Sequence, residues 1–206
     1  MGTRHLIVVV NDEKYPVAQY GQWDGHPGGQ GKTVLTFCRD HLATPEGRAM
    51  FREKLKLCRF VTEQEHTAMW ASVGADDSGL VGMDVAGKFS AKWPQLSREC
   101  GALVLAYVWN AQDNVLLKDE TNFAADSLFC EWAYVVDLDA GMLEGYKGFQ
   151  QEPLPATDRF AHLYTRVERR NNDQYYPIRM RASWPLAALP TDDEFYAALN
   201  DPPEEE

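Results

Sequence analysis

The sequence predicts an α+β fold in which a mainly antiparallel sheet, made of two hairpins and a C-terminal strand, packs with four to five helices. In two places, apolar strand-like runs flank a short turn-like sequence, a pattern typical of β-hairpins. Other stretches carry apolar residues at helical spacing. Strand-like and helix-like segments follow one another in runs instead of regular βαβ alternation, which favours α+β over a parallel sheet.

A hairpin opens the chain, and three helices are expected to follow it. The hairpin extends from His5 to Tyr20 around a turn-like sequence at residues 11–14. The helices are recognised by apolar residues at helical spacing and by start signals, namely an N-cap threonine before a proline and a Thr-x-x-Glu capping box. They begin, in order, at Thr33, at Thr44 and at the capping box of Thr62 and Glu65.

The middle of the chain is expected to hold a loop and a buried helix. Residues 72–92 contain four glycines and three aspartates, which predicts a long irregular loop. A helix, apolar on most sides, is expected from Trp93 to Val108. Gly101 lies inside it, so we expect a neighbouring element to pack against the backbone there.

The C-terminal part supplies the remaining strands and a last helix. The second hairpin is expected to join residues 129–137 to residues 142–149. Residues 175–184 alternate at period two, which predicts a fifth strand with Tyr176, Ile178, Met180, Ala182 and Trp184 on one buried face. Thr191 precedes three acidic residues and is expected to cap a short helix.

Length and charge limit the classes of function. The chain has 206 residues and a formal net charge of −11. We expect one domain over residues 1–200, followed by an acidic, disordered tail at residues 201–206. The negative charge disfavours direct binding of nucleic acid, because the phosphate backbone would be repelled. An acidic surface favours solubility or docking onto a basic protein partner. The oligomeric state stays open.

The cysteines and the hydropathy pattern predict a cytoplasmic protein that does not contact a membrane. The chain has neither a signal-like apolar segment nor a run of 18 apolar residues. The cysteines lack metal-binding spacing and are expected to be free, buried thiols. Three histidines are expected to be solvated, and no metal or cofactor is predicted. These residues are Cys38, Cys58, Cys100, Cys130, His41, His66 and His162.

A glycine-rich loop at residues 20–31 is the leading candidate for a ligand site. It holds five glycines in twelve residues, between a strand and a helix. Glycine is placed where the backbone needs positive φ or must approach another group closely. Gly28, Gly29, Gln30 and Gly31, with Lys32 at the helix start, are therefore expected to seat an anion.

The same loop ends in Gly-Lys-Thr, which resembles the end of a phosphate-binding P-loop. The first glycine of that motif would stand at position 26, where this chain has His26. The parallel βαβ units in which the motif occurs are also missing. A nucleotide-hydrolysing P-loop is therefore disfavoured, whereas anion binding without hydrolysis is retained.

Aromatic and polar side chains in the loop suit a nucleotide base or sugar. Tyr20 and Trp23 offer stacking faces, and Gln22 and Asp24 offer directional hydrogen bonds. His26 extends this set, and Arg4 on the paired strand is expected to reach the same rim. The alternative is structural: the two aromatic rings anchor the core, Asp24 caps the turn and His26 faces water.

Arginines near the C-terminus form the one basic cluster of the sequence. Arg179 and Arg181 are expected to share a strand face about 7 Å apart, which suits a clamp for phosphate or carboxylate. The alternative is surface pairing with the many acidic residues. The cluster also includes Arg166, Arg169 and Arg170.

Two features of the sequence are compatible with a hydrolase. Gly2-Thr3 before an apolar strand is the arrangement with which N-terminal nucleophile hydrolases begin, but a retained Met1 leaves Thr3 without a free amine. Asp24 or His26 could instead act as a base in hydrolysis of an amide or a phosphoester.

Residues 1–6, residues 18–25 and the Gly29-Gln30-Gly31 stretch resemble a family of uncharacterised phage and bacterial proteins. Residues 94–98 and the hairpin at residues 132–149 are also similar to it, so the resemblance covers about residues 1–150. It implies no activity and no catalytic residues. A phage setting would favour an inhibitor of host defence.

The leading hypothesis is a cytoplasmic protein that binds an anionic, nucleotide-like small molecule and, in a phage, sequesters a signalling nucleotide. The rivals are an acidic interaction protein that inhibits a host protein and the hydrolase described above. The expected ligand-binding residues are Arg4, Tyr20, Gln22, Trp23, Asp24, His26, Gly28, Gly29, Gln30, Gly31, Lys32, Arg179 and Arg181.

Overall fold

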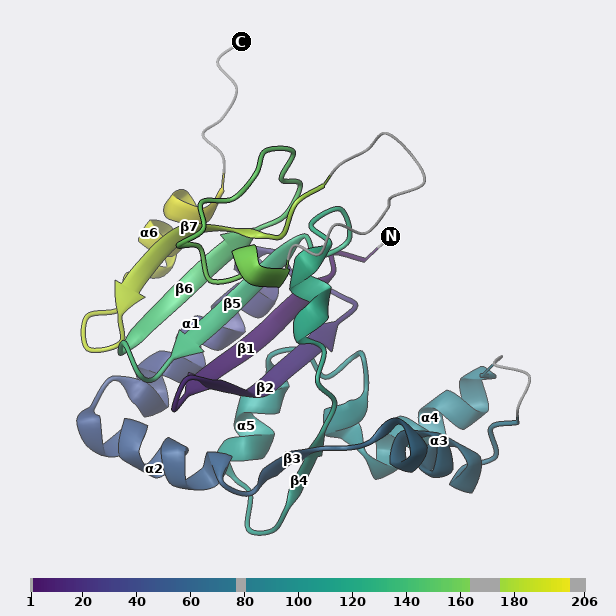
Figure 1. The fold of residues 1–206 in the computed structure, drawn as a ribbon. Coiled ribbons are helices and arrows are strands. Elements are labelled where there is room, and N and C mark those ends of the chain that lie inside the picture. Colours follow the sequence, from purple (N-terminus) through teal and green to yellow (C-terminus); the bar gives the residue numbers. More distant parts are fainter. Residues whose placement is uncertain (1, 77–80, 164–174, 201–206) are drawn as a thin grey trace.

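The predicted α+β fold is confirmed in a computed structural model, which describes residues 2–76, 81–163 and 175–200. A five-stranded sheet with the order β2-β1-β5-β6-β7 forms the centre of the molecule (Figure 1). Every neighbouring pair is antiparallel except β1 and β5, which are parallel. The predicted tail and the arginines at positions 166, 169 and 170 lie outside the described residues.

Both predicted hairpins are present and lie side by side in the sheet. The first consists of β1 (His5–Asn11) and β2 (Lys14–Gly21), and the second of β5 (Trp132–Asp137) and β6 (Met142–Lys147). β1 and β5 are apolar and buried almost throughout, as expected for central strands covered on both faces. The parallel contact between the two hairpins was not predicted.

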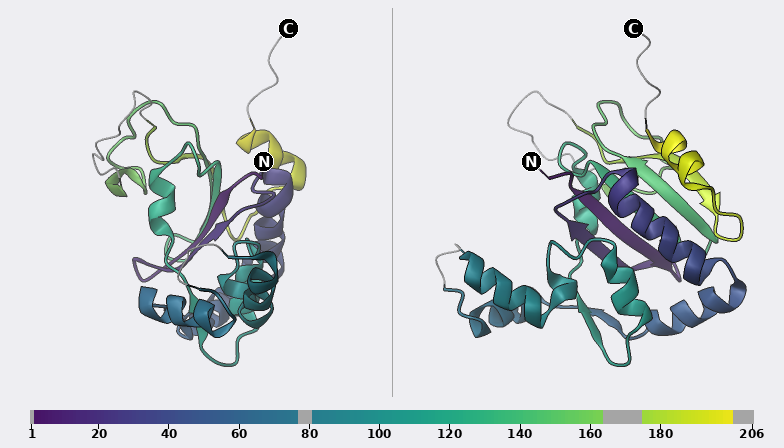
Figure 2. Two further views of the ribbon diagram at one scale, coloured as in Figure 1. Left: turned by 90° about the vertical axis from the view of Figure 1, so that its right-hand side faces the viewer. Right: turned by 180° about the vertical axis from the view of Figure 1, so that it is seen from behind.

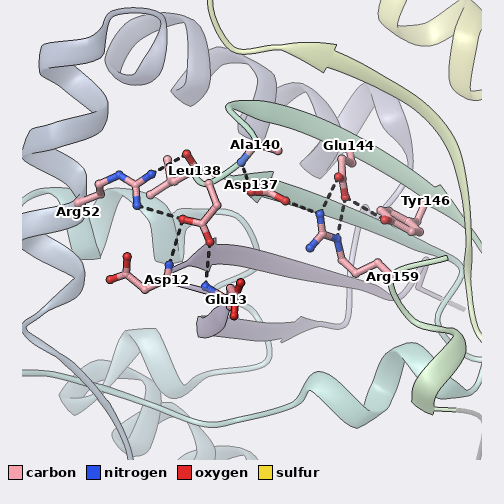
Figure 3. Close-up of polar contacts among 10 residues, drawn as sticks. Asp12, Glu13, Arg52, Asp137, Leu138, Ala140, Glu144, Tyr146 and Arg159 are labelled. Carbon is pink, nitrogen blue, oxygen red and sulfur yellow. Dashed lines mark hydrogen bonds and ion pairs between the residues drawn. The ribbon is translucent and has the colours of Figure 1, made fainter. Parts of the chain in front are cut away.

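The tips of the two hairpins are held together by polar contacts (Figure 3). The Asp139 carboxylate accepts hydrogen bonds from the backbone N–H groups of Asp12 and Glu13, at 3.0 and 2.9 Å. Both turn residues have positive φ, 52° and 58°, which costs energy in a non-glycine residue. Arg52 donates to Asp139 Oδ1 at 3.2 Å and to the Leu138 carbonyl at 2.7 Å. These bonds offset the cost of the strained turn.

One face of the sheet is covered by helices. Seen from behind in Figure 2, α1 (Lys32–Phe37) lies across the sheet with α6 (Asp192–Leu199) beside it. α2 (Pro45–Leu55) and α5 (Leu103–Trp109) complete this layer. Their apolar side chains form the larger core with inward-facing residues of the sheet, including Ile7, Val9, Tyr134, Val136 and Leu143.

The other face is covered by short turns and loops. A 3₁₀ turn, η4 (Thr121–Ala125), and the segment at residues 150–163 lie over it (Figure 1). The second core on this side contains Leu6, Val8, Val135, Tyr146 and Phe160. Alternate residues of β1 and β5 thus enter opposite cores, which is the period-two pattern of a strand buried on both faces.

The prediction of an irregular loop over residues 72–92 is wrong for the second half of this segment, which forms helix α4 (Met83–Lys92). Together with α3 (Glu63–Ser72) it makes an arm that projects from the body (Figure 1). The Trp70 and Phe89 rings stack with centroids 3.8 Å apart and planes 7° apart, which joins the two helices. This non-local contact outweighs the low helix propensity of Gly87.

The prediction of one helix from Trp93 to Val108 is also wrong in its first half. A 3₁₀ turn, η3 (Pro94–Leu96), comes first, and α5 begins only at Leu103. Gly101 has φ +50° and lies in the connecting turn. A close neighbour does occur there, as expected, because a Cβ on Gly101 would lie 2.6 Å from Gln30 Oε1 and 3.0 Å from His5 Nε2. The short parallel strands β3 (Cys58–Phe60) and β4 (Val115–Leu117), which link the body to the arm, were missed.

The fifth strand, β7 (Arg179–Pro185), is present, but its side chains do not share one face. The register of β6 and β7 shifts beyond Gly145, so that Arg181 is an additional residue in the strand. A bulge of this kind reverses the in–out pattern. Ile178 therefore enters the second core, whereas Ala182 and Trp184 pack against the first.

Candidate functional site

The glycine-rich loop crosses from the end of β2 over β1 to β5. The Gly25 N–H donates to the Thr3 carbonyl at 2.9 Å, and the buried Tyr134 hydroxyl donates to the Gly25 carbonyl at 2.9 Å. A Cβ on Gly31 would lie 2.7 Å from the Tyr134 ring, and one on Gly29 would lie 2.2 Å from the Asp24 carbonyl. Glycine is needed at these positions because the loop packs tightly against the sheet.

His5 is the side chain around which the loop closes. It is fully buried, and Cβ atoms on Gly21, Gly25 and Gly101 would lie 2.1, 2.7 and 3.0 Å from its side-chain atoms. Neither ring nitrogen has a hydrogen-bond partner among the residues that the structure describes. Burial lowers the pKa of His5 to about 4, and the nearby Thr3 backbone opposes this shift only in part. His5 is thus neutral at pH 7.

The groups expected to bind an anion in the loop are already engaged. The N–H groups of Gly29 and Gly31 both donate to the His26 carbonyl, at 3.0 and 3.4 Å, within a turn of π-helix, η1 (Pro27–Gly31). Lys32 Nζ lies 2.9 Å from Asp192 on α6. The Gln30 side chain accepts a hydrogen bond from the Ala102 N–H at 2.8 Å. This geometry does not favour an anion seat within the loop itself.

The other predicted residues are spread along one end of the sheet. The Trp23 side chain is 44% exposed, and Asp24 has φ 57°. In the described part of the chain no hydrogen bond joins Asp24 to His26, and the role of either residue as a base stays a prediction. Arg4 lies over the Phe129 ring at 4.6 Å and 3.6 Å from Glu131.

The two predicted clamp arginines lie far across the sheet from the loop. β7 is separated from β1 by β5 and β6. Arg179 pairs with Lys147, and Arg181 is the additional residue of the bulge. The regular two-residue spacing that the clamp requires is therefore not present.

A cavity of about 340 Å³ lies beside the loop, between the exposed edge of β2 and the α3–α4 arm, and we call it the arm cavity. Its volume falls at the lower end of the range of small-molecule sites, roughly 300–1,000 Å³. One wall is apolar and aromatic, and the rest carries charged and polar groups. The lining includes Tyr20, His66, Trp70, Phe89, Arg98, Lys118 and Glu120.

A carboxylate at the edge of β2 forms the polar side of the arm cavity. Glu120 Oε2 accepts a hydrogen bond from the Tyr20 N–H at 2.8 Å, and Glu120 Oε1 lies 3.8 Å from Lys118 Nζ. Burial raises the pKa of Glu120, and this shift is opposed by the Tyr20 N–H and by Lys118. Carboxyls with such shifts in a cavity are frequent at functional sites.

The aromatic wall is held by a histidine with a defined tautomer. The Trp70 indole N–H donates to His66 Nε2 at 3.2 Å, so neutral His66 carries its proton on Nδ1. Burial, followed by the charge of Lys118, lowers the pKa of His66. The Trp70–Phe89 stack and the His66 ring therefore form a rigid, uncharged wall.

Unused hydrogen-bonding capacity remains at the floor of the arm cavity. Gln19 lines it and is 3% exposed, and its Nε2 group donates to the carbonyls of Tyr20 and Ser97, at 3.0 and 3.4 Å. Its Oε1 atom is buried and has no hydrogen-bond partner within the described part of the chain. A buried acceptor of this kind costs about 1–3 kcal/mol until a donor reaches it.

Two of the predicted residues adjoin the arm cavity. Tyr20 lines it, and its hydroxyl donates to Gln22 Oε1 at 2.5 Å. The Gln22 N–H donates to the Arg98 carbonyl at 2.9 Å. Sequence reasoning missed the other lining residues, although the i, i+4 spacing of His66 and Trp70 places both on one face of a helix.

In comparisons with known proteins, no protein-family model, curated protein or solved structure matches the chain. Across residues 2–76, 81–163 and 175–200, no group of three or more His, Cys, Asp or Glu side chains is arranged to hold a metal ion. None of the helices described is long and apolar enough to cross a bilayer. All four cysteines are free, as expected, and three of them are buried, whereas Cys58 is only half-buried.

Proposed function

We propose that the protein binds an anionic, nucleotide-like small molecule in the arm cavity. The single observation that carries this proposal is that Gln19, which lines that cavity, has a buried Oε1 atom with no hydrogen-bond partner among the described residues. A ligand with an N–H donor would complete the hydrogen bonding of this atom. Nucleobases carry such donors on a flat ring.

The shape of the arm cavity suits a planar ring. Trp70 and Phe89 form a stacked aromatic pair, and Tyr20 at the edge of the sheet also lines the cavity. The Tyr20 ring is fixed by an edge-to-face contact with Phe123 at 4.8 Å. A flat heterocycle that lies against these rings would bury apolar surface at little cost in side-chain order.

A cation at the rim supports an acidic ligand. Arg98 lines the arm cavity, and its guanidinium forms no ion pair among the residues that the structure describes. Lys118 is a second cation, held only loosely at 3.8 Å from Glu120. Because arginine binds phosphate through two parallel hydrogen bonds, Arg98 is the expected partner of a ligand phosphate.

The proposal is tested by isothermal titration of nucleosides and their mono- and diphosphates. The Arg98→Ala variant is expected to bind the phosphorylated forms about 10- to 100-fold more weakly, because a charge-assisted hydrogen bond contributes about 1.5–3 kcal/mol. Its affinity for the uncharged nucleoside should stay unchanged. The Gln19→Leu variant should bind both the phosphorylated forms and the uncharged nucleoside more weakly, by a similar factor.

Lys88→Ala is the matched control for the loss of charge. Lys88 lies on the same arm, is exposed and, among the described residues, pairs with Asp84 alone, at 2.7 Å, so its removal should leave the affinity for nucleotides unchanged. The proposal would be wrong if no nucleotide produces heat of binding at millimolar concentration. It would also be wrong if nucleotides bind equally tightly to the wild type and to the Arg98→Ala variant. A phage protein that binds nucleotides in this way would be suited to sequester a signalling nucleotide of its host.

A further inference from the structure

A second cavity of about 440 Å³ lies on the opposite face of the sheet, between β6 and the segment at residues 150–163, and we call it the Arg159 cavity. It shares no lining residue with the arm cavity. Its polar lining mixes donors and acceptors, and the Tyr15 ring adds an apolar surface. The residues that matter are Tyr15, Glu144, Tyr146, Asp158, Arg159 and His162.

Arg159 is fixed by two carboxylates (Figure 3). Its Nε and Nη2 groups donate to both oxygens of Glu144, at 2.9 and 2.7 Å, and Nη2 also donates to Asp137 at 2.5 Å. The Glu144 carboxylate accepts a further bond from the Tyr146 hydroxyl at 2.9 Å. Among the described residues, no bond uses Nη1. The guanidinium is thus held in place with one NH₂ group left to donate.

His162 presents an acceptor to the same cavity. Its Nδ1 atom lies 2.8 Å from the Arg159 carbonyl and must donate to it, because a carbonyl oxygen only accepts. The tautomer of neutral His162 is therefore fixed, and Nε2 carries a lone pair. His162 is exposed, so this lone pair is accessible to a ligand.

Asp158 adds a second carboxyl group to the lining, beside that of Glu144. Burial raises the pKa of Asp158, and nearby backbone N–H groups and Arg179 oppose the shift. The carboxyls of Glu144 and Asp137 have all their oxygens occupied by Arg159, by the Tyr146 hydroxyl or by the Ala140 N–H. The negative charges of Glu144 and Asp137 are therefore satisfied internally and do not call for a cation.

We propose that the Arg159 cavity binds a neutral, polyhydroxylated ligand such as a sugar. Adjacent hydroxyl groups both donate and accept, which matches a lining that offers both the Nη1 donor of Arg159 and the Nε2 acceptor of His162. A sugar ring also has an apolar C–H face that can lie against Tyr15. A ligand with net charge would contact groups of both signs, so attraction and repulsion would partly cancel and it would bind more weakly.

The test is an NMR titration of the full ¹⁵N-labelled chain with neutral sugars and polyols, namely glucose, galactose, mannose, ribose and inositol. At least one is expected to shift the amide signals of residues 158–163 saturably at millimolar concentration. The His162→Ala variant should bind about tenfold more weakly, because one hydrogen bond is lost. Since His162 is exposed, this substitution should not disturb the fold.

Two comparisons make the outcome decisive. The Arg98→Ala variant, altered in the arm cavity, should bind the sugar like the wild type. The Asp158→Asn variant keeps hydrogen-bonding capacity and should retain most of the affinity. The proposal would be overturned if no neutral compound shifts these amide signals, or if only glucosamine or glucose 6-phosphate does. It would also be overturned if the His162→Ala variant binds the sugar as tightly as the wild type.

Discussion

Acidification should destabilise the fold through His5. The imidazole is fully buried against three glycines, has no hydrogen-bond partner on either nitrogen, and has a pKa of about 4 in the folded protein. In the unfolded chain a histidine has a pKa of about 6.5. The unfolded state therefore binds a proton at a pH where the folded state does not, and each such proton favours unfolding.

The size and the pH window follow from these two pKa values. Above pH 6.5 the imidazole is neutral in both states, and its protonation does not affect stability. As the pH falls from about 6.5 to about 4, only the unfolded state gains the proton, and the free energy of unfolding decreases. At about 1.4 kcal/mol for each pH unit, the loss reaches about 3 kcal/mol and then levels off. That is a large part of the 5–15 kcal/mol typical of a domain.

Urea unfolding of the wild type and of a His5→Leu variant, at intervals between pH 7.5 and 4, would measure this effect. Other groups also titrate in this range, so the relevant quantity is the difference between the two proteins. We expect the wild type to lose about 3 kcal/mol more than the variant over this interval. The His5 ring signals, followed by NMR in the folded protein, report the same pKa directly. A His5 that titrates near pH 6.5 in the folded state, or equal pH dependence in both proteins, would refute the reasoning.

Three further predictions concern stability and are measured by the same urea unfolding. Replacing Arg159 with Met leaves two buried carboxylates unpaired and should cost about 3–5 kcal/mol, whereas Lys should recover part of the loss. Thr191→Ala removes the N-cap of α6 and should cost about 1 kcal/mol, with Ser as a neutral control; an equal loss from Ser would contradict the capping role. Gly87→Ala, in a helix with open space around it, should stabilise by about 0.5–1 kcal/mol. Gly31→Ala should instead destabilise, because its Cβ would collide with Tyr134; the same sign for both glycines would show that packing does not distinguish them.

Much of the fold could be predicted because its signals are local. Thr44, Thr62 and Thr191 each accept a hydrogen bond from the N–H three residues later, as their sequence context indicates. Both hairpins were likewise predicted from apolar runs on either side of a turn-like sequence. Each of these features is decided by a few consecutive residues, so a single sequence carries enough information.

The features that were missed depend on contacts between distant segments. The glycines of the loop could equally serve a ligand or close packing, and the difference is made by His5 and Tyr134, which lie elsewhere in the sequence. Helix α4 was missed because its main stabilising contact is with Trp70, about twenty residues earlier. The bulge at Arg181 follows from pairing with β6 and leaves no mark in the alternation itself.

The arm cavity exists because two weak elements support each other. α3 has no buried side chain, and Phe89 is the only buried one in α4, so neither helix gains much by packing alone. The Trp70–Phe89 stack joins them, and the hydrogen bond from Trp70 to His66 fixes the stack. A ligand that fills the cavity would add contacts to both helices and to the edge of β2 at once. Binding should therefore protect the amides of α3 from hydrogen exchange more than those of β1, which the core already protects.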